Sequence, residues 1–553
     1  MPTGAELFVE TLAELGIRTV FTLVGDHLNQ VLSCASRAGF RIVGVRHESA
    51  AVHAADALAR LQRRPAVALV TGGPGHTNAV TGIATAAAVG SPVIAVSGAP
   101  PQAQAGRPGF QVIDQVSIVR PLVKWAAEVQ RPDQIRYFVT RAYQEANAPR
   151  KGPVHLTVPA DVFAGQVAQP LPGVDLTETG APRPDARLVE RALELLRNAQ
   201  RPVVIGGSGL WWADAGPVLK IFLERTRLPL FTLTLARGLI PDGELNCFGY
   251  GDPALSKLVR RAFPLADVVL VLGKRIDYRL ALGGQLLFSP EAKFIQVDIH
   301  AQELGANREL AVGIHADVRA TLEALVDAVG KDRWPERPDW LQRLEQLERE
   351  WKAELEQLAQ DRTQPIHPAA FFFELRKHLP EVIYSWDGGD FVHWGRAILP
   401  ARRAGAWLRL GRMATIGAGL PNAIAMQLHY PNERVVMITG DGSLGFYLAE
   451  LDTLVRERLP VIVIVGNDGG WGIERELQRE LQGTTVACEL QRSRYELVME
   501  AFGGAGETIG SLDQVGPAVQ RALRSEVPYL LNVQIRGVRS PFTEWALLRR
   551  RSG

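Results

Sequence analysis

Short runs of apolar residues recur along the chain, and several end in a glycine-rich turn. Residues 435–438 and 461–465 are two such runs, built mostly from valine and isoleucine. Continuous β-branched runs are typical of parallel strands that are buried on both faces of a sheet. Between the two runs, leucines at helical intervals predict one connecting helix: Leu444, Leu448, Leu451 and Leu454. A strand, helix, strand unit of an α/β sheet is therefore expected here.

The same unit occurs near the N-terminus. A glycine-rich turn at residues 71–75 and an apolar run at 93–96 resemble the turn at 439–443 and the run at 461–464. One constant offset in residue number superimposes both pairs. This duplication predicts two α/β domains of one topology at opposite ends of the chain.

A third domain is expected between these two. Apolar runs at 202–205, 268–272 and 294–297 predict further buried parallel strands. The glycines after residue 205 do not form the G-x-G-x-x-G pattern of dinucleotide-binding turns, which favours a structural turn. A proline-rich stretch at 170–184 predicts a linker.

A second linker is predicted to be helical. It is charged, but apolar residues recur in it at helical intervals: Trp340, Leu341, Leu344, Leu347 and Trp351. The predicted fold is α/β, with three doubly wound parallel-sheet domains. Their expected bounds are 1–168, 185–330 and 365–540, with the helical linker at 331–364 and a basic tail at 541–553.

Composition narrows the class of protein. The 553 residues are 46% hydrophobic, which is enough for several full cores, and the net charge of +2 gives no general signal for nucleic-acid binding. Residues 1–23 carry acids within their apolar stretch, unlike a signal peptide, and no apolar run is long enough to span a bilayer. Cys34, Cys247 and Cys488 lie far apart, which fits a reducing compartment, so we expect the cytoplasm.

Two strands of the C-terminal domain end in glycine-rich turns that bear an acid, Asp441 in the first and Asp468 in the second. In a parallel sheet adjacent strand ends lie side by side, where open α/β sheets bind ligands. Magnesium usually takes one or two protein carboxylates together with phosphate oxygens. Gly440, Gly442 and Ser443 allow a close approach of the backbone. The pair of acids therefore predicts a site for magnesium and a diphosphate.

Three elements together point to one family: the two acid turns, the turn Gly73-Pro74-Gly75-x-x-Asn78, and Glu48 after the apolar strand at 42–45. Over essentially its whole length the chain resembles the thiamine diphosphate enzymes of the acetolactate synthase superfamily. That family has pyrimidine-binding, central and diphosphate-binding domains in this order, so the resemblance implies a thiamine diphosphate-binding fold. It also implies active sites between two subunits, and hence a homodimer or homotetramer.

The resemblance implies roles for individual residues. Glu48 corresponds to the acid that hydrogen-bonds the aminopyrimidine of the cofactor, and a carboxyl group in an apolar pocket suits the proton transfer required there. Asp441, Asp468 and the backbone carbonyl of Gly470 correspond to the metal ligands. Ile416 corresponds to the apolar residue that bends the cofactor. The other residues expected to contact thiamine diphosphate are Pro74, Asn78, Gly389, Asp390, Phe391, Gly440, Gly442, Ser443 and Trp471.

One position departs from the family pattern. Asn467-Asp468 stands where the family usually has Asn-Asn, so a carboxylate replaces an amide as metal ligand. A second anion is expected to tighten magnesium binding without changing the geometry. The Gly-Asn-Asp-x-Gly-Trp form is most similar to the endoplasmic-reticulum type of 2-hydroxyacyl-CoA lyase.

The residues expected to face the substrate match those of enzymes with different reactions. Phe110-Gln111 matches an element of synthases and lyases, which makes Gln111 a candidate hydrogen-bond partner of the substrate. Asp26 and Glu474 match acids of pyruvate-type decarboxylases, whereas His27 matches a histidine of benzaldehyde lyase. Acids near the reacting carbon disfavour a 2-oxo acid carboxylate but suit proton transfer to or from a hydroxyl group.

These residues favour a thiamine diphosphate- and magnesium-dependent carbon-carbon lyase or carboligase. The preferred reaction is that of 2-hydroxyacyl-CoA lyase, which gives an aldehyde or ketone plus formyl-CoA. Acetolactate synthase, a benzaldehyde lyase-like activity and 2-oxo acid decarboxylase remain open. The expected partner is a small-molecule substrate, with an acyl-CoA favoured, and neither nucleic acid nor a membrane is expected. FAD, which many synthases bind in the central domain, has no specific motif here.

Overall fold

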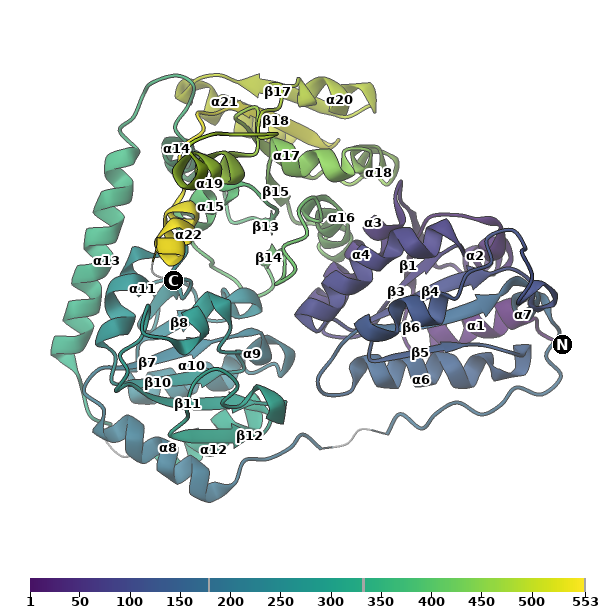
Figure 1. Ribbon diagram of the computed structural model, residues 1–553, viewed down its shortest axis with the longest axis horizontal. Helices are drawn as coiled ribbons and strands as arrows, with labels where there is room; N and C mark the ends of the chain where they lie inside the picture. Colours follow the sequence, from purple (N-terminus) through teal and green to yellow (C-terminus); the bar gives the residue numbers. More distant parts are fainter. Residues whose placement is uncertain (178–179, 331–333, 552–553) are drawn as a thin grey trace.

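Three six-stranded parallel sheets make up the computed structural model, which describes residues 1–177, 180–330 and 334–551. Each sheet forms its own lobe with helices packed around it, and the lobes follow one another along the chain (Figure 1). The predicted α/β fold with three parallel-sheet domains is confirmed. Across the described ranges, no helix is both long and apolar enough to cross a membrane.

The N-terminal sheet has the strand order β2-β1-β3-β4-β6-β5. Its strands are β1 Thr19–Thr22, β2 Arg41–Gly44, β3 Ala66–Val70, β4 Val93–Ala99, β5 Trp125–Glu128 and β6 Val154–Pro159. Its helices are α1 Gly4–Glu14, α2 Asn29–Arg37, α3 Glu48–Gln62, α4 Pro74–Val89, α5 Gln115–Val119, α6 Ile135–Asn147 and α7 Ala160–Ala164.

The C-terminal sheet repeats that topology as β14-β13-β15-β16-β18-β17, in which every strand stands where its counterpart stands in the first sheet. Its strands are β13 Ile383–Trp386, β14 Trp407–Arg409, β15 Val435–Gly440, β16 Ile462–Asn467, β17 Ala505–Ile509 and β18 Tyr529–Gln534. Its helices are α14 Pro368–His378, α15 Asp390–Ile398, α16 Gly419–His429, α17 Asp441–Leu444, α18 Glu450–Arg456, α19 Gly472–Gln482, α20 Tyr495–Ala501, α21 Val515–Arg524 and α22 Pro541–Arg551. The duplication inferred from the glycine turns thus extends to whole sheets.

The central sheet has the order β12-β11-β10-β7-β8-β9. Its strands are β7 Pro202–Gly206, β8 Leu230–Thr232, β9 Cys247–Tyr250, β10 Val268–Leu272, β11 Lys293–Asp298 and β12 Val312–His315. Its helices are α8 Ala186–Asn198, α9 Ser208–Trp212, α10 Gly216–Thr226, α11 Lys257–Ala262 and α12 Val318–Val329.

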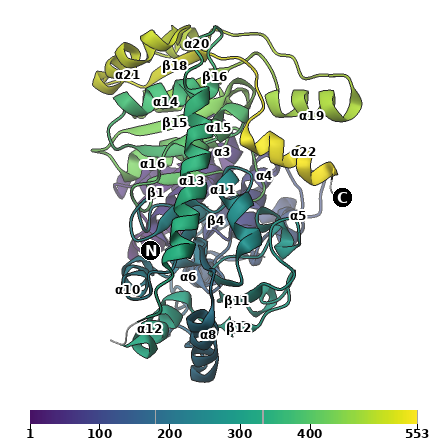
Figure 2. The same cartoon turned by 90° about the vertical axis from the view of Figure 1, so that its left-hand side faces the viewer.

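A single helix, α13 Pro338–Leu358, leads from the central to the C-terminal domain (Figure 2). It is amphipathic, and its buried face carries Trp340, Leu344, Leu347, Trp351 and Leu355. Residues 331–333 of the predicted linker lie outside the described residues, as do residues 552 and 553 of the basic tail. The rest of that tail forms α22, which buries Trp545 and Leu547 and leaves Arg549 and Arg550 exposed.

The N-terminal and C-terminal domains share one hydrophobic core. Helix α3 packs against α16 (Figure 1), and buried side chains such as Val52 and Ile424 belong to the same cluster. The hydroxyl groups of Thr85 and Thr415 meet across this contact at 2.7 Å. The domains that bear the two glycine turns are therefore joined by one shared hydrophobic core.

The segment after β15 differs from its prediction. In place of one helix it forms α17, a 3₁₀ turn at Gly445–Tyr447, and α18. Gly442 and Gly445 lie in this segment, and glycine loses more conformational freedom in a helix than any other residue. The apolar spacing detects the buried face but not these interruptions.

Candidate active site

Both acid turns lie at the carboxyl edge of the C-terminal sheet. Strands β15 and β16 are adjacent and parallel, with Gly440 in register with Gly466, so Asp441 and Asp468 follow neighbouring strand ends. A cavity of about 180 Å³ opens here. Its lining includes every residue of this domain that the sequence analysis selected: Gly389, Asp390, Phe391, Ile416, Gly440, Asp441, Gly442, Ser443, Asp468, Gly470, Trp471 and Glu474.

Asp441 and Asp468 form a pair of acids in a water-poor environment. Burial, reinforced by the negative charge of Asp468, raises the pKa of Asp441 to about 7. Burial also raises the pKa of Asp468. The backbone N–H of Gly470 donates to Asp441 Oδ2 at 3.1 Å. Two carboxyl groups that oppose each other's ionisation in this way would both be stabilised by a divalent cation.

Arg475, in the first turn of α19, pairs with one of these acids. Its Nη1 lies 3.2 Å from Asp468 Oδ2, and both side chains are largely buried. The same guanidinium donates to the carbonyl of Gly469 and to Glu489 Oε2. Asp468 is therefore not a free second anion, since an arginine shares its charge.

The turn after β13 closes another side of the cavity. Gly389 has a φ of 111°, a conformation that favours glycine, and Gly440 N–H donates to Gly388 O at 2.9 Å. A Cβ atom on Gly388 would lie only 2.4 Å from Ile416 Cγ2. Because Gly388 has no side chain, Ile416 packs directly against the backbone of this turn.

Asp390, at the start of α15, is tied to the C-terminal end of the chain. Its Oδ1 accepts hydrogen bonds from the hydroxyl groups of Ser540 and Thr543. Its Oδ2 is buried and has no hydrogen-bond partner among the described residues. Burial raises the pKa of Asp390 to about 6. The neighbouring Phe391 is a core side chain, whose ring packs on Gly466 and lies 4.6 Å from that of Phe372.

The N-terminal residues form a second cluster. Glu48 begins α3, is 7% exposed, and accepts a hydrogen bond from Asn78 Nδ2 at 2.9 Å. A Cβ atom on Gly75 would lie 3.4 Å from Glu48 Oε1, so this oxygen faces the glycine turn. Pro74 and Asn78 are exposed at the start of α4. The predicted Glu48 and glycine turn therefore do come together.

His27 is held beside the same turn. Its Nδ1 lies 2.9 Å from Thr71 Oγ1 and accepts the N–H of Gly72 at 3.2 Å, which places the ring proton of a neutral imidazole on Nε2. Burial lowers the pKa of His27, so the imidazole is neutral at pH 7. Asp26, by contrast, is exposed and accepts from Asn29.

Two glutamines border the N-terminal turn. Gln111 has a φ of 59° and packs against Gly73, where a Cβ atom would meet it at 2.8 Å. Gln115 is buried and donates to Gly98 O at 3.1 Å, and its Oε1 lacks a partner among the described residues. The sequence analysis selected Gln111 but gave Gln115 no role.

The N-terminal cluster does not line the C-terminal cavity. The C-terminal cavity is lined only by residues from Pro368 onward, so neither Glu48 nor Asn78 faces it. Glu474 is exposed at this cavity, whereas Asp26 belongs to the N-terminal cluster.

Other residues of the C-terminal site escaped the sequence analysis. Asp387 is buried and accepts from Gly417 N–H at 2.8 Å and Thr439 Oγ1 at 2.9 Å, so it fixes the turn that carries Ile416. Burial raises its pKa to about 6. Its position directly before Gly388-Gly389 could have identified Asp387 as a site residue from the sequence. Arg475 had a weaker signal, as a cation one turn into the helix after the second acid turn.

The donor set suits a diphosphate bridged by a metal. Within the described parts of the chain, no group of three His, Cys, Asp or Glu side chains could hold a metal ion by itself. Two carboxylates and a backbone carbonyl are oxygen ligands that suit magnesium when phosphate oxygens complete its coordination shell. The glycine turns leave room for those phosphates. The residues present therefore fit both groups.

Comparison with known proteins identifies the family. Residues 2–118 match the model of the thiamine pyrophosphate enzyme N-terminal TPP binding domain, residues 189–325 that of the central domain, and residues 387–533 that of the C-terminal TPP binding domain. Thiamine pyrophosphate (TPP) is thiamine diphosphate.

Relatives are similar over nearly the whole chain. The acetolactate synthase large subunit IlvG of Mycobacterium tuberculosis is 34% identical over 535 residues, covering 96% of this chain and 95% of the relative. A 2-hydroxyacyl-CoA lyase 2 of Caenorhabditis elegans is 32% identical, covering 92% and 84%. A 2-hydroxyacyl-CoA lyase 1 of Homo sapiens is 28% identical, covering 96% and 94%. The chain therefore belongs to the thiamine pyrophosphate enzymes, and it is an enzyme that depends on thiamine diphosphate.

Proposed function

We propose that this enzyme is a magnesium-dependent carbon-carbon lyase that cleaves a 2-hydroxyacyl-CoA to formyl-CoA and an aldehyde or ketone. The observation that carries the proposal is the exposed carboxylate of Glu474, which lines the cavity beside Asp441 and Asp468. An acid there would repel the carboxylate of a 2-oxo acid, but it can exchange a proton with a hydroxyl group. The relatives named 2-hydroxyacyl-CoA lyase add support.

In this proposal the C-terminal cavity binds the diphosphate. Asp441, Asp468 and the carbonyl of Gly470 would hold magnesium, and Gly440 and Gly442 would let the backbone approach the phosphates. When bound, thiamine diphosphate would supply a nucleophilic carbon and a sink for negative charge. Asp441 binds a cation only as a carboxylate, which it becomes at and above neutral pH.

The N-terminal cluster would serve the proton transfers. Glu48 Oε1, which faces Gly75, would exchange a proton with the aminopyrimidine of the cofactor. Neutral His27 can donate from Nε2 to a substrate oxygen, and Gln111 Nε2 is a second candidate donor. Because Glu48 does not reach the diphosphate cavity of its own chain, a second subunit would supply it.

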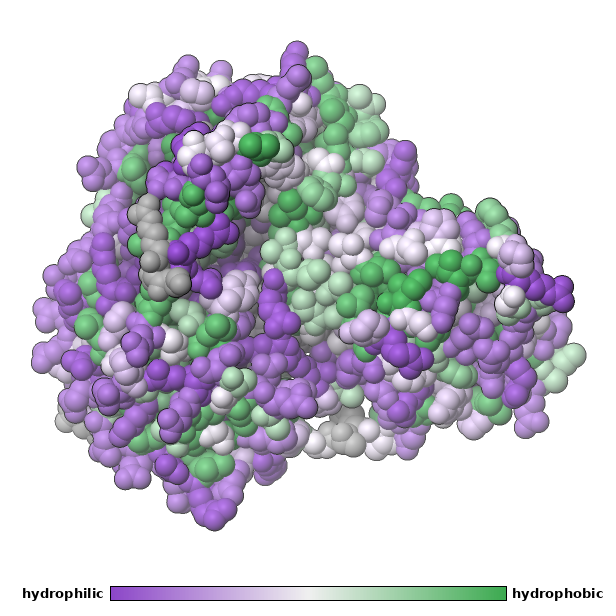
Figure 3. All heavy atoms as spheres, viewed as in Figure 1, coloured by the Kyte–Doolittle hydropathy of each residue, from purple (hydrophilic) through white to green (hydrophobic). Residues whose placement is uncertain are grey.

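Exposed apolar side chains support this assembly. Phe110 is 77% exposed, Phe446 is 58% exposed and Met413 is 53% exposed. Figure 3 shows apolar residues gathered along the N-terminal domain and where it meets the C-terminal domain. Exposed apolar side chains that lie close to site residues are typical of a protein interface. We therefore infer a homodimer or a larger even-numbered assembly.

A mixing experiment tests the shared site. Glu48→Gln and Asp441→Asn each inactivate one half of it, so each variant alone should be inactive. Mixed subunits should regain up to about a quarter of the wild-type activity, because half of the dimers are mixed and half of their sites are intact. If a single chain supplies both halves, mixing will restore nothing.

A substrate screen with product identification tests the reaction. We expect formyl-CoA from a 2-hydroxyacyl-CoA in the presence of thiamine diphosphate and Mg²⁺, and no cleavage of the free hydroxy acid. Acetolactate synthase is the second candidate, supported by the relative that is 34% identical. Release of carbon dioxide and acetolactate from pyruvate, without cleavage of the thioester, would replace the lyase proposal with that alternative.

A further inference from the structure

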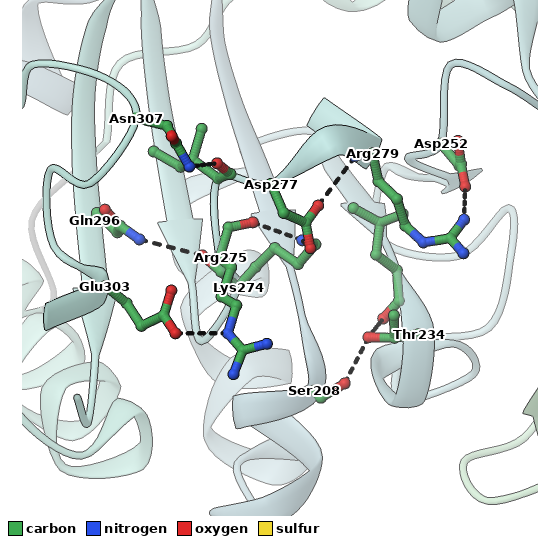
Figure 4. A network of polar contacts seen from close by, with 12 residues as sticks. Ser208, Thr234, Asp252, Lys274, Arg275, Asp277, Arg279, Gln296, Glu303 and Asn307 are labelled. Atoms are coloured by element: carbon green, nitrogen blue, oxygen red, sulfur yellow. Dashed lines mark hydrogen bonds and ion pairs between the residues drawn. The ribbon is translucent and has the colours of Figure 1, made fainter. Parts of the chain in front are cut away.

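A group of buried arginines lies where the central domain meets the C-terminal domain. We call Arg237, Arg279, Arg396 and Arg409 the arginine cluster. Arg237 is 2% exposed, Arg396 7% and Arg409 5%. Two of the four have carboxylate partners: Arg237 Nη1 lies 2.7 Å from Asp242 Oδ1, and Arg279 Nη1 lies 2.6 Å from Asp252 Oδ2 (Figure 4).

The other two share one phenolic oxygen. Arg396 Nη2 donates to Tyr250 Oη at 2.5 Å, and Arg409 Nη1 approaches the same oxygen at 3.3 Å. In the described part of the chain neither guanidinium forms an ion pair with a carboxylate, and the buried Nε of Arg396 has no acceptor. The cluster therefore carries an excess of positive charge away from water, an arrangement that is costly unless an anion compensates it.

Tyr250 can compensate only part of this charge. Burial raises the pKa of its phenol, but Arg396 and Arg409 outweigh burial and lower it to about 7. Even an ionised Tyr250 supplies one negative charge for two unpaired guanidinium groups. Another anion is needed to balance the cluster.

A cavity of about 660 Å³ opens onto the cluster between β9, α13, α14 and α15. Tyr250, Arg396 and Arg237 line it, and aromatic walls come from Trp351, Phe373 and Trp407. Glu356 and Glu381, which also line it, are exposed at its rim. It shares no lining residue with the cavity that holds Asp441 and Asp468.

We propose that this second cavity binds an oxyanion carried on an apolar or aromatic body. The guanidinium of Arg396 and the hydroxyl of Tyr250 would bind the anionic group, with Arg409 contributing charge from behind. The aromatic side chains would contact the rest of the ligand. A carboxylate and a phosphate ester share this chemistry, and the two probes below separate them.

The test uses the protein saturated with thiamine diphosphate and Mg²⁺, so that its diphosphate site is filled. Benzoate and phenyl phosphate are titrated separately by calorimetry. We expect saturable binding of at least one probe, weakened tenfold or more in Arg396→Gln. Arg402→Gln, an exposed position on the rim of the same cavity, is the matched control and should bind as the wild type does.

Tyr250→Phe serves if Arg396→Gln does not fold, because it removes the shared oxygen and keeps all four arginines in place. It should weaken binding of the same probe severalfold, and the probe should raise the melting temperature of the wild type more than that of the variant. Absence of saturable binding to the wild type would overturn the proposal. So would binding that neither Arg396→Gln nor Tyr250→Phe weakens.

Discussion

The N-terminal and C-terminal domains have the same strand order but present different chemistry at the same turn. After β3 the chain runs through Thr71 and Gly73 to Pro74, and the long helix α4 begins. At the end of β15 it runs through Thr439 and Gly440 to Asp441, where only the short α17 begins. A shared backbone therefore places the turn, while the side chains decide what it binds.

The equivalent threonines sharpen this contrast. Thr71 Oγ1 contacts His27, which burial keeps neutral, whereas Thr439 Oγ1 donates to Asp387, a carboxyl group. The first threonine thus faces a neutral imidazole and the second faces an acid. We propose that the first turn suits proton transfer at the pyrimidine and the second suits a metal-bound diphosphate. The following predictions separate these two roles.

The largest effect is expected at the N-terminal cluster. Glu48→Gln should lower turnover by about 10²–10⁴-fold, the usual contribution of a positioned acid or base. The affinity for thiamine diphosphate, followed by quenching of tryptophan fluorescence, should change little because the diphosphate site is intact. The exposed Glu190→Gln is the control. Near-normal turnover in Glu48→Gln would remove the proposed role.

Asp441→Asn should weaken cofactor binding, which Glu48→Gln leaves nearly unchanged. Loss of a charged ligand should weaken magnesium-dependent cofactor binding by about 100-fold, with turnover restored in part at high Mg²⁺. Equilibrium dialysis of the cofactor at several Mg²⁺ concentrations measures this. Asp513→Asn, an exposed acid of the same domain, should have no effect. Equal cofactor binding by Asp441→Asn and wild type would mean that the metal lies elsewhere.

Arg475→Gln should have a smaller effect on the same site. It removes a cation that competes for Asp468, so Mg²⁺ should bind at least about fivefold more tightly, because neighbouring charges interact by about 1 kcal/mol in water and more strongly when buried. Arg479→Gln, one turn further along α19, is the matched control. If Arg475→Gln instead weakens Mg²⁺, the arginine orients Asp468 rather than competing with the metal.

The smallest effect concerns pH. The pKa of Asp441 is raised from 3.8 to about 7 in the folded protein, so folding takes up a proton at this group between those pH values. Its contribution to stability is complete below pH 3.8 and is lost as the pH rises towards 7. Without cofactor and metal, the melting temperature of the wild type should therefore fall relative to that of Asp441→Asn over this range, by about four degrees.

Metal binding requires the ionised form of Asp441, so the affinity for Mg²⁺ should rise over the same pH range. A difference in melting temperature between wild type and Asp441→Asn that does not vary with pH would show that the folded pKa is not raised.

Much of this structure can be predicted from sequence for a physical reason. Buried parallel strands are continuous apolar runs, and ligand turns such as Gly440-Asp441-Gly442 follow directly after them. Local sequence therefore places the two acids and their glycines at one edge of the sheet, whereas Ile416 was selected only through the family resemblance. The cavity, lined by all twelve selected residues of the domain, agrees with that.

Partners that come from distant segments could not be predicted. Ser540 and Thr543 reach Asp390 from the other end of the domain. The separation of Glu48 from Asp441 likewise depends on how α3 packs against α16. Such contacts depend on tertiary packing, which the spacing of apolar residues along the chain does not reveal.

The hydrogen bonds from Ser540 and Thr543 to Asp390 have a consequence for biosynthesis. Domains generally fold as units, beginning with the N-terminal one while the chain is still being made. The N-terminal sheet can form early, but the carboxyl group of Asp390 gains these two donors only when the start of α22 has left the ribosome. The nascent chain can therefore fix the carboxyl group of Asp390 only after residue 543 has emerged.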